Sequence, residues 1–231
     1  MLDFETFRFM QHFEKQISEY AYRTGKTNAE AIASLLDYII SYFDVNVYLG
    51  NKERPQDKEL CSLMSEYFLC QQRMMRHNNW FDVWGVLFEK LVTNGAKGQF
   101  FTPPSLCDMM AQMQISKDLP KTHSTPFGKR VTINDCACGS GRTLLSAHCQ
   151  FMPKEEINTQ SWKPYLYADD VDGMCCKMCA VNFMVHGCFG EVRLHNTLSE
   201  PNKYHIRYVI NEAMHPFPSP TPSIRICLPK G

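Results

Sequence analysis

The stretch "RVTINDCACGSGRTLL", residues 130–145, joins a β-branched run to a glycine turn and then to an apolar helical pattern. The β-branched run favours a strand. Gly139 and Gly141 permit a tight turn and let a ligand approach the backbone closely. Leu144 and Leu145 belong to the helix that follows. A strand, a glycine turn and a helix in this order are typical of an α/β domain whose ligand lies at the end of the strand.

Three more segments of strand length follow: "YLYADDVD", "EVRLHNTL" and "RYVINEA". They are separated by helix or loop signals, and strands that alternate with helices favour a parallel α/β sheet. In the proline-rich tail only "SIRIC" could add another strand. We therefore expect a partial α/β domain over residues 96–231.

Residues 1–95 are predicted to form a helical N-terminal domain. Thr27 and Glu30 in "TNAE" make a capping-box signature. Apolar residues recur at helical spacing in four segments. These residues are Met10, Phe13, Ile17 and Tyr20; Ile32, Leu35, Leu36, Ile39, Ile40 and Phe43; Leu60, Leu63, Met64 and Tyr67; and Trp80, Trp84, Leu87, Phe88 and Leu91. Their apolar faces are expected to pack on one another or on the neighbouring domain.

The composition narrows the class of protein. With 44% hydrophobic and 21% charged residues in a chain of 231, the sequence is globular in character. The formal net charge is +0, so no overall basic surface indicates independent binding to nucleic acid. The first ten residues carry acids and no apolar signal core, and no run of 18 apolar residues could span a bilayer. We expect a cytoplasmic protein without membrane contact.

Eleven cysteines raise the question of a metal. The densest group, Cys175, Cys176 and Cys179, lies in a helix-like run between Asp172 and Gly187. A structural zinc needs four ligands. Three other cysteines could complete such a set: Cys136, Cys138 and Cys188. Because the helical context places the group at core positions, we interpret it as core packing and expect no metal.

Ligands of an open parallel sheet bind at the carboxyl edge of the strands. An NAD fingerprint would need a third glycine where Leu144 stands, and the Gly-Lys-Ser/Thr of a P-loop is absent. S-adenosylmethionine (SAM) needs only a glycine turn and an acid at each of the first two strand ends. Asp135 is placed to meet the cationic amine of its methionine part, and Asp170 to accept both ribose hydroxyls.

Two neighbours compete with Asp170 for the ribose: Asp169 and Asp172, of which Asp172 is alternatively a helix N-cap. At the third strand end, Asn196 in "HNTL" can present an acceptor and a donor to an adenine edge. The same residue could equally be a turn asparagine.

The segment "GQFFTPPSLCDMM", residues 98–110, precedes the glycine turn in the chain. Leu106, Met109, Met110 and Met113 form one apolar helical stripe, with Thr102 expected at the N-cap and Pro103 at the first helical position. Adjacent phenylalanines in an extended segment face opposite ways. One ring can therefore enter a core while the other needs a separate partner.

Taken together, these motifs resemble the N6-adenine DNA methyltransferases, specifically the modification subunit of type I restriction systems. The family order is Gly-Gln-Phe-Phe/Tyr-Thr-Pro, Asp-Pro-Ala-Cys-Gly-Thr-Gly, an acid after the second strand and Asn-Pro-Pro-Phe/Tyr. Here "GQFFTPP", "DCACGSG" and Asp170 follow it, and "FDVWGVLFEKLV" resembles the segment that leads into the motifs. The resemblance covers residues 80–217 and implies a Rossmann-like SAM-dependent methyltransferase sheet behind a helical N-terminal domain.

The resemblance also implies which residues contact the cofactor, SAM. The aromatic segment would fold over the pocket, the glycine turn with Asp135 would surround the methionine part, Asp170 would hold the ribose and Asn196 would lie beside the adenine. The expected contact residues are Gln99, Phe100, Phe101, Thr102, Asp135, Gly139, Ser140, Gly141, Asp170 and Asn196. DNA would be the substrate, reached through a separate specificity subunit in a homo- or hetero-oligomer.

The catalytic quartet is altered. In the family its Asn and a proline carbonyl accept the target amine, while the aromatic ring stacks the flipped base. This chain has "YVINEAMHPF", and registers that start at Asn211, Glu212 or Met214 each lack part of that set. A surrogate would use Asn211, Pro216 and Phe217. The sequence leaves three hypotheses: an adenine-N6 methyltransferase, a non-catalytic descendant that acts as an interaction or regulatory module, and a helical interaction module that binds no cofactor.

Overall fold

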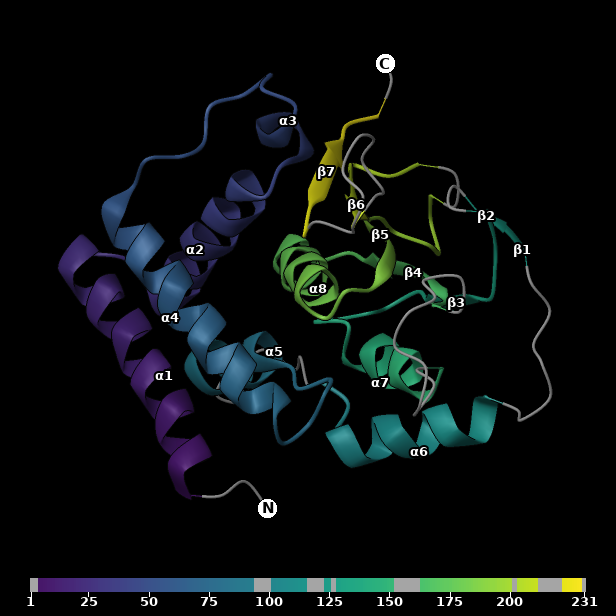
Figure 1. Ribbon diagram of the computed structural model, residues 1–231, viewed down its shortest axis with the longest axis horizontal. Helices are drawn as coiled ribbons and strands as arrows, with labels where there is room; N and C mark the ends of the chain where they lie inside the picture. Colours follow the sequence, from purple (N-terminus) through teal and green to yellow (C-terminus); the bar gives the residue numbers. More distant parts are fainter. Residues whose placement is uncertain are drawn as a thin grey trace.

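The computed structural model describes residues 4–93, 101–115, 123–125, 128–151, 163–200, 203–211 and 222–229. Figure 1 shows the N-terminal helices on one side of the molecule and a β-sheet on the other. Helix α8 lies between them, and α6 and α7 lie side by side below the sheet. The two predicted halves are thus recognisable as a helical part and an α/β part.

The helical part contains the four predicted helices and a short additional one. Their bounds are α1 Phe4–Thr24, α2 Asn28–Tyr42, α3 Val45–Tyr48, α4 Lys58–Met75 and α5 Val83–Phe88, which continues as the π-helix η1 Glu89–Thr93. Thr27 and Glu30 form the predicted capping box. Trp80 precedes the fourth helix instead of lying in it, because the side chain of Asp82 caps the first turn through the Gly85 amide at 2.7 Å.

Aromatic side chains fill the centre of the helical part. The Trp84 ring lies 6.0 Å from that of Phe13 and 4.6 Å from that of Tyr67, measured between ring centroids. All three rings are buried. Burial of each such side chain contributes on the order of 2 kcal/mol to folding. Packing of the apolar faces against one another therefore holds α1, α4 and α5 together.

The α/β part is built on one sheet of five strands in the order β3-β4-β5-β6-β7. Their bounds are β3 Thr132–Asp135, β4 Tyr165–Asp170, β5 Phe189–Leu194, β6 Ile206–Ile210 and β7 Ile224–Cys227. All five were predicted from the sequence as strand segments. A separate hairpin of β1 His123–Thr125 and β2 Gly128–Arg130 was not predicted.

The sheet is only partly parallel. Strands β3, β4 and β5 are parallel as predicted, whereas β6 and β7 run antiparallel. A parallel neighbour requires a crossover connection of a dozen or more residues. The described residues between β5 and β6 contain no helix, so the chain returns directly and β6 pairs with β5 in the antiparallel sense.

This topology separates the two ends of the sheet. Asp135 pairs in register with Ala168, and Asp170 with Leu194, so β3, β4 and β5 end at one common edge. Ile210 pairs with Gly190 near the start of β5. Asn211, which follows β6, therefore lies at the opposite edge.

Helix α8 (Gly173–Val185) is buried along nearly its whole length. It contacts α2 on one side and β4 and β5 on the other. Cys175, Cys176 and Cys179 are buried in it, which confirms their interpretation as core residues. Burial raises the pKa of the Cys179 thiol to about 11. Within the described ranges, no group of three or more His, Cys, Asp or Glu side chains could hold a metal ion.

Helix α6 (Pro104–Gln114) forms where the apolar spacing predicted a helix. It begins one residue late, with Pro103 at the N-cap and no side-chain cap, because a residue before proline is driven into the extended region, here φ −55° and ψ 142°. Its apolar stripe faces outward: Leu106, Met109, Met110 and Met113 are 40, 49, 38 and 77% exposed. The buried residues are the small Cys107 and Ala111, and α6 packs against α7 (Arg142–Gln150).

None of the helices in the described part of the chain combines the length and the apolar character that crossing a bilayer requires.

Candidate functional site

The glycine turn between β3 and α7 is tied to the ends of two parallel strands. Asp135 accepts a hydrogen bond from the Ala137 amide at 3.1 Å and another from the Thr143 hydroxyl. Asp170 accepts one from the Gly139 amide at 2.9 Å. The two acids that the sequence assigned to a cofactor thus lie beside the same turn, one at each strand end.

The two glycines of the turn face different neighbours. Gly139 has φ +55°, and a Cβ there would lie 2.8 Å from two ring carbons of Phe101. Gly141 has φ +87°, and a Cβ there would lie 2.7 Å from the Sγ of Cys179 in α8. Gly139 therefore leaves room for the aromatic segment, and Gly141 lets α7 begin against the core.

Phe101 is the described member of the phenylalanine pair. Its ring packs on Gly139 and on Phe88, with 5.9 Å between the Phe centroids. Its amide donates to Glu89 at 3.2 Å, measured to Oε1. The structure thus brings the aromatic segment and the glycine turn into contact, and Gly139 is the partner that one ring needed. Gln99 and Phe100 lie outside the described residues.

Thr102 accepts hydrogen bonds through its backbone carbonyl, and it is not the N-cap of α6. Its carbonyl oxygen accepts from Arg142 Nη1 at 3.2 Å and from the Cys107 thiol at 3.5 Å. The predicted N-cap role passes to Pro103 for the reason given above.

A buried polar network beneath the turn was not predicted. Asp82 Oδ2 accepts from Ser140 Oγ at 2.5 Å and from Arg142 Nε at 3.1 Å, and its Oδ1 accepts from Asn182 Nδ2 at 2.8 Å. Arg142 Nη2 donates to Glu89 at 3.3 Å. The side chain of Ser140, expected near the cofactor, is thus buried and directed to the helical part. The network joins polar side chains that are far apart in the sequence. No local sequence pattern predicts it.

The side chains of Asp169 and Asp172, the other two acids considered for the ribose, bond to groups outside the glycine turn. Asp169 is buried and forms a bidentate ion pair with Arg193, at 2.6 Å to Nε and 2.7 Å to Nη2. Asp172 caps α8 by accepting from the amides of Met174 and Cys175 at 2.7 and 3.4 Å. Asp170 is half-exposed, and of the three acids it is the one whose carboxylate accepts from the Gly139 amide of the turn.

Asn196 follows β5 at the same edge of the sheet and is exposed. Its Oδ1 accepts from the amides of Leu198 and Ser199 at 3.2 and 3.1 Å. These bonds are those of a turn asparagine, which is one of the two interpretations that the sequence left open. The adenine contact remains a prediction.

The structure does not bring Asn211 to this edge. Its side chain is buried, its Nδ2 donates to the carbonyls of Met184 and Cys188 at 3.2 and 2.9 Å, and its Oδ1 accepts from the Ser223 amide at 3.1 Å. With φ +53° it makes a corner that joins α8, β5 and β7. The predicted catalytic partners Pro216 and Phe217 lie outside the described residues.

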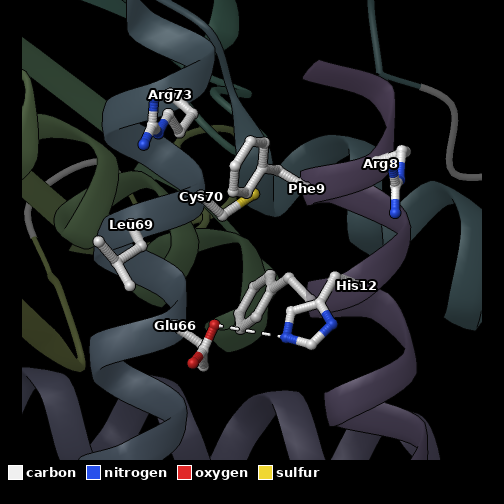
Figure 2. Close-up of a pocket in the computed structure, with 8 residues that line it drawn as sticks. Arg8, Phe9, His12, Glu66, Leu69, Cys70 and Arg73 are labelled. Atoms are coloured by element: carbon white, nitrogen blue, oxygen red, sulfur yellow. Dashed lines mark ion pairs between the residues drawn. The ribbon is translucent and has the colours of Figure 1, made fainter. Parts of the chain in front are cut away.

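A groove in the helical part lies apart from these groups. Figure 2 shows it between α1 and α4, with Phe9, Leu69 and Cys70 along it and His12 paired with Glu66 at 3.6 Å. Its volume is about 450 Å³. Neither a strand end nor the glycine turn lines it, so we do not assign the cofactor to this groove.

Comparison with known proteins gave one family and two similar structures. The model of the family described as N-6 DNA Methylase matches residues 79–216. No curated protein sequence matched. The fold is similar to that of a protein from Listeria monocytogenes described as a class I S-adenosylmethionine-dependent methyltransferase, with 16% identity, a TM-score of 0.50, and coverage of 81% of this chain and 52% of that one.

A second similar structure is the type I restriction-modification system methyltransferase subunit from Streptococcus thermophilus. It has 17% identity and a TM-score of 0.40, over 84% of this chain and 40% of that chain. This chain therefore spans about half the length, or less, of the two solved structures that it matches. The Listeria structure, at such low identity, supports the SAM-dependent methyltransferase fold and nothing finer.

Proposed function

Because the chain belongs to the N-6 DNA methylase family, we propose that it binds S-adenosylmethionine at the glycine turn and serves the methylation of adenine N6 in DNA. The observation that carries the proposal is the contact of Phe101 with Gly139, whose amide is bonded to Asp170 at the end of β4. Asp135 lies at the end of β3 beside the same turn. An aromatic ring, a left-handed glycine and two carboxylates thus meet at the carboxyl ends of the parallel strands β3 and β4.

The residues at this edge suit the chemistry of the cofactor. Each carboxylate oxygen has more than one acceptor site, so Asp170 can hold its backbone amides and still accept ribose hydroxyls. Asp135 would hold the cationic methionine amine, Phe101 would flank the cofactor, and Asn196 would lie toward the adenine. The bound cofactor supplies an electrophilic methyl group.

Titration of SAM into the chain by calorimetry tests the binding. We expect saturable heat, and a loss of affinity of about tenfold or more in Asp170→Asn, which removes a charged acceptor. Asp37→Asn makes the same change at an exposed acid paired with Lys177 and should bind as the wild type does. Absence of saturable heat in the wild type would remove the proposal.

We further propose that the substrate is DNA and that a separate specificity subunit supplies sequence recognition, in a homo- or hetero-oligomer. The formal net charge of +0 supports this division, because DNA affinity comes largely from basic surface. Transfer of tritium from labelled SAM to unmethylated DNA measures the activity. Transfer confined to a nucleic acid other than DNA, or to protein, would contradict the assignment of substrate.

The position of Asn211 favours a second candidate, a SAM-binding protein that does not transfer the methyl group. Its amide is committed to backbone partners at the edge opposite the glycine turn. This candidate predicts SAM binding without transfer to DNA. Methylation of adenine by the chain alone would exclude it.

A further inference from the structure

Two charged side chains join the helical part to the aromatic segment. Glu89, at the start of η1, accepts from the Phe101 amide through Oε1 at 3.2 Å and from Arg142 through Oε2 at 3.3 Å. Arg142, at the start of α7, donates in addition to the Thr102 carbonyl at 3.2 Å and to Asp82 at 3.1 Å. Arg142 therefore contacts the N-cap of α5, the π-helix η1 and the aromatic segment.

The burial of Arg142 makes these contacts specific. Its side chain is only 5% exposed, and a buried guanidinium is stabilised only where carboxylates and carbonyls satisfy its donors in a fixed geometry. Asp82 and Glu89 supply the two opposite charges, and Thr102 supplies the carbonyl. The guanidinium carbon also lies 5.6 Å from the centre of the Phe101 ring. Backbone and ring of the aromatic segment are thus held from the same side.

Glu89 is the first residue of the π-helix η1. Helix α5 ends at Phe88, and the wider turn of η1 begins at the next residue. π-turns are rare and occur often at functional sites. The ring of Phe88 packs on the ring of Phe101, and the carboxylate of Glu89 accepts a hydrogen bond from the Phe101 amide. Two consecutive residues of the helical part therefore contact the ring and the backbone of Phe101.

We propose that Glu89 and Arg142 are positioning residues, which hold Phe101 over Gly139 and thereby let the helical part set the affinity of the cofactor pocket. This inference rests on the proposed function, because it assumes that SAM binds at the glycine turn. Neither residue needs to touch the cofactor. Both act through the backbone and ring of Phe101.

The test uses Glu89→Ala in the full chain, with two readouts. Hydrogen exchange of the Phe101 amide, followed in protein labelled with ¹⁵N-phenylalanine, should become about tenfold faster, because the charged acceptor is lost. The dissociation constant for SAM should rise by a similar factor. In a second sample labelled with ¹⁵N-glycine, the Gly139 amide, bonded to Asp170, should keep its protection and report an intact turn.

The chain offers a matched control. Lys90 is the neighbour of Glu89 on η1 and pairs with Glu14 on α1. Lys90→Ala removes a charge and an ion pair from the same π-turn without contact to Phe101, and it should change neither readout. Glu89→Gln keeps an acceptor for the Phe101 amide and should restore part of the protection and of the affinity.

The outcomes separate the two proposals. Faster exchange at Phe101 with unchanged affinity for SAM would overturn the positioning role and leave the proposed function standing. Equal losses of affinity in Glu89→Ala and Lys90→Ala would also overturn it, because the effect would then not pass through Phe101. A wild-type chain that does not bind SAM would overturn the proposed function and this inference with it.

Discussion

Gly139 has two independent reasons to lack a side chain. Its φ of +55° lies in the left-handed region, where a Cβ costs about 1–2 kcal/mol, and the Cβ position is occupied by the Phe101 ring at 2.8 Å. The φ angle affects only the stability of the chain, whereas the contact with the Phe101 ring also affects the position of the aromatic segment. A suitable pair of variants separates them.

We predict that Gly139→Ala both destabilises the chain and weakens SAM binding by about tenfold or more, because Phe101 must move away from the turn. Gly25→Ala is the control, since Gly25 has φ +66° but nothing within 4 Å of its Cβ position. Thermal unfolding should show a similar strain in both variants, and calorimetry should show an affinity loss in Gly139→Ala alone. Equal affinities in the two variants would contradict the contact.

The buried side chain of His148 makes the free energy of unfolding depend on pH. Its side chain is buried on α7 with Nε2 unpartnered, and burial, with smaller effects from Lys163 and His186, lowers its pKa to about 3. The unfolded chain, with an ordinary His pKa of about 6.5, takes up a proton at a pH where the folded chain does not. Stability is therefore fully present above about pH 6.5 and is lost as the pH falls toward 3.

We predict that His148→Gln removes part of this slope. The wild type should lose up to roughly 1.4 kcal/mol of unfolding free energy for each pH unit below about 6, beyond the loss in the variant. Urea denaturation at a series of pH values between about 4 and 8 measures the difference. If the free energy of unfolding falls with pH by the same amount in the two proteins, His148 is accessible to protons in the folded state.

At the scale of elements, α6 illustrates what periodicity can and cannot predict. The spacing of Leu106, Met109, Met110 and Met113 predicted the helix correctly. It does not indicate the buried face, because the buried residues of this helix, which packs against α7, are the small Cys107 and Ala111. A stripe of large apolar residues indicates a helix, whereas the neighbouring helix decides which face is covered.

We predict that Ala111→Gln destabilises the chain by about 1–3 kcal/mol, because an amide would be forced into the α6–α7 contact. Met113→Gln, on the same helix but 77% exposed, should change the free energy of unfolding by less than about 0.5 kcal/mol. Chemical denaturation of both variants measures this. A larger loss in Met113→Gln would contradict the assignment of Cys107 and Ala111 to the buried face of α6.

The five strands of the main sheet and their order in the chain were predictable from local sequence patterns and turn residues, whereas the β1–β2 hairpin was not predicted. The direction of β6 was not, because it depends on whether the connection carries a helix. The positions of Asp135, Asp170 and Gly139 followed from one rule about the carboxyl edge of a parallel sheet. Asn211 escaped that rule because its strand is antiparallel, which places the residue at the other edge.

At the scale of the whole molecule, Asp82 joins the two parts. It caps α5 and accepts from Ser140, Arg142 and Asn182, which come from the glycine turn, α7 and α8. The sequence could not reveal this cluster, because its members are separated by up to 100 residues. Its loss would leave the charge of Arg142 buried with Glu89 as the remaining carboxylate.

We predict that Asp82→Ala lowers the free energy of unfolding by about 3–5 kcal/mol, the usual effect of removing one partner of a buried pair. Asp37→Ala breaks the exposed pair with Lys177 and should cost about 1 kcal/mol or less. Urea unfolding should give coincident transitions by circular dichroism and by tryptophan fluorescence, recorded in a Trp162→Phe background so that the remaining tryptophans, Trp80 and Trp84, report the helical part. Separate transitions would mean that the two parts fold independently.

Strand β3 is the outermost member of its sheet, and among the described strands it pairs only with β4. Among the described strands, none pairs with its outward amides and carbonyls. Were another strand to join here in the parallel sense, it would terminate next to Asp135. The sheet can thus be extended on the side where we propose that the cofactor binds, and the last residues of an added strand would line the proposed site.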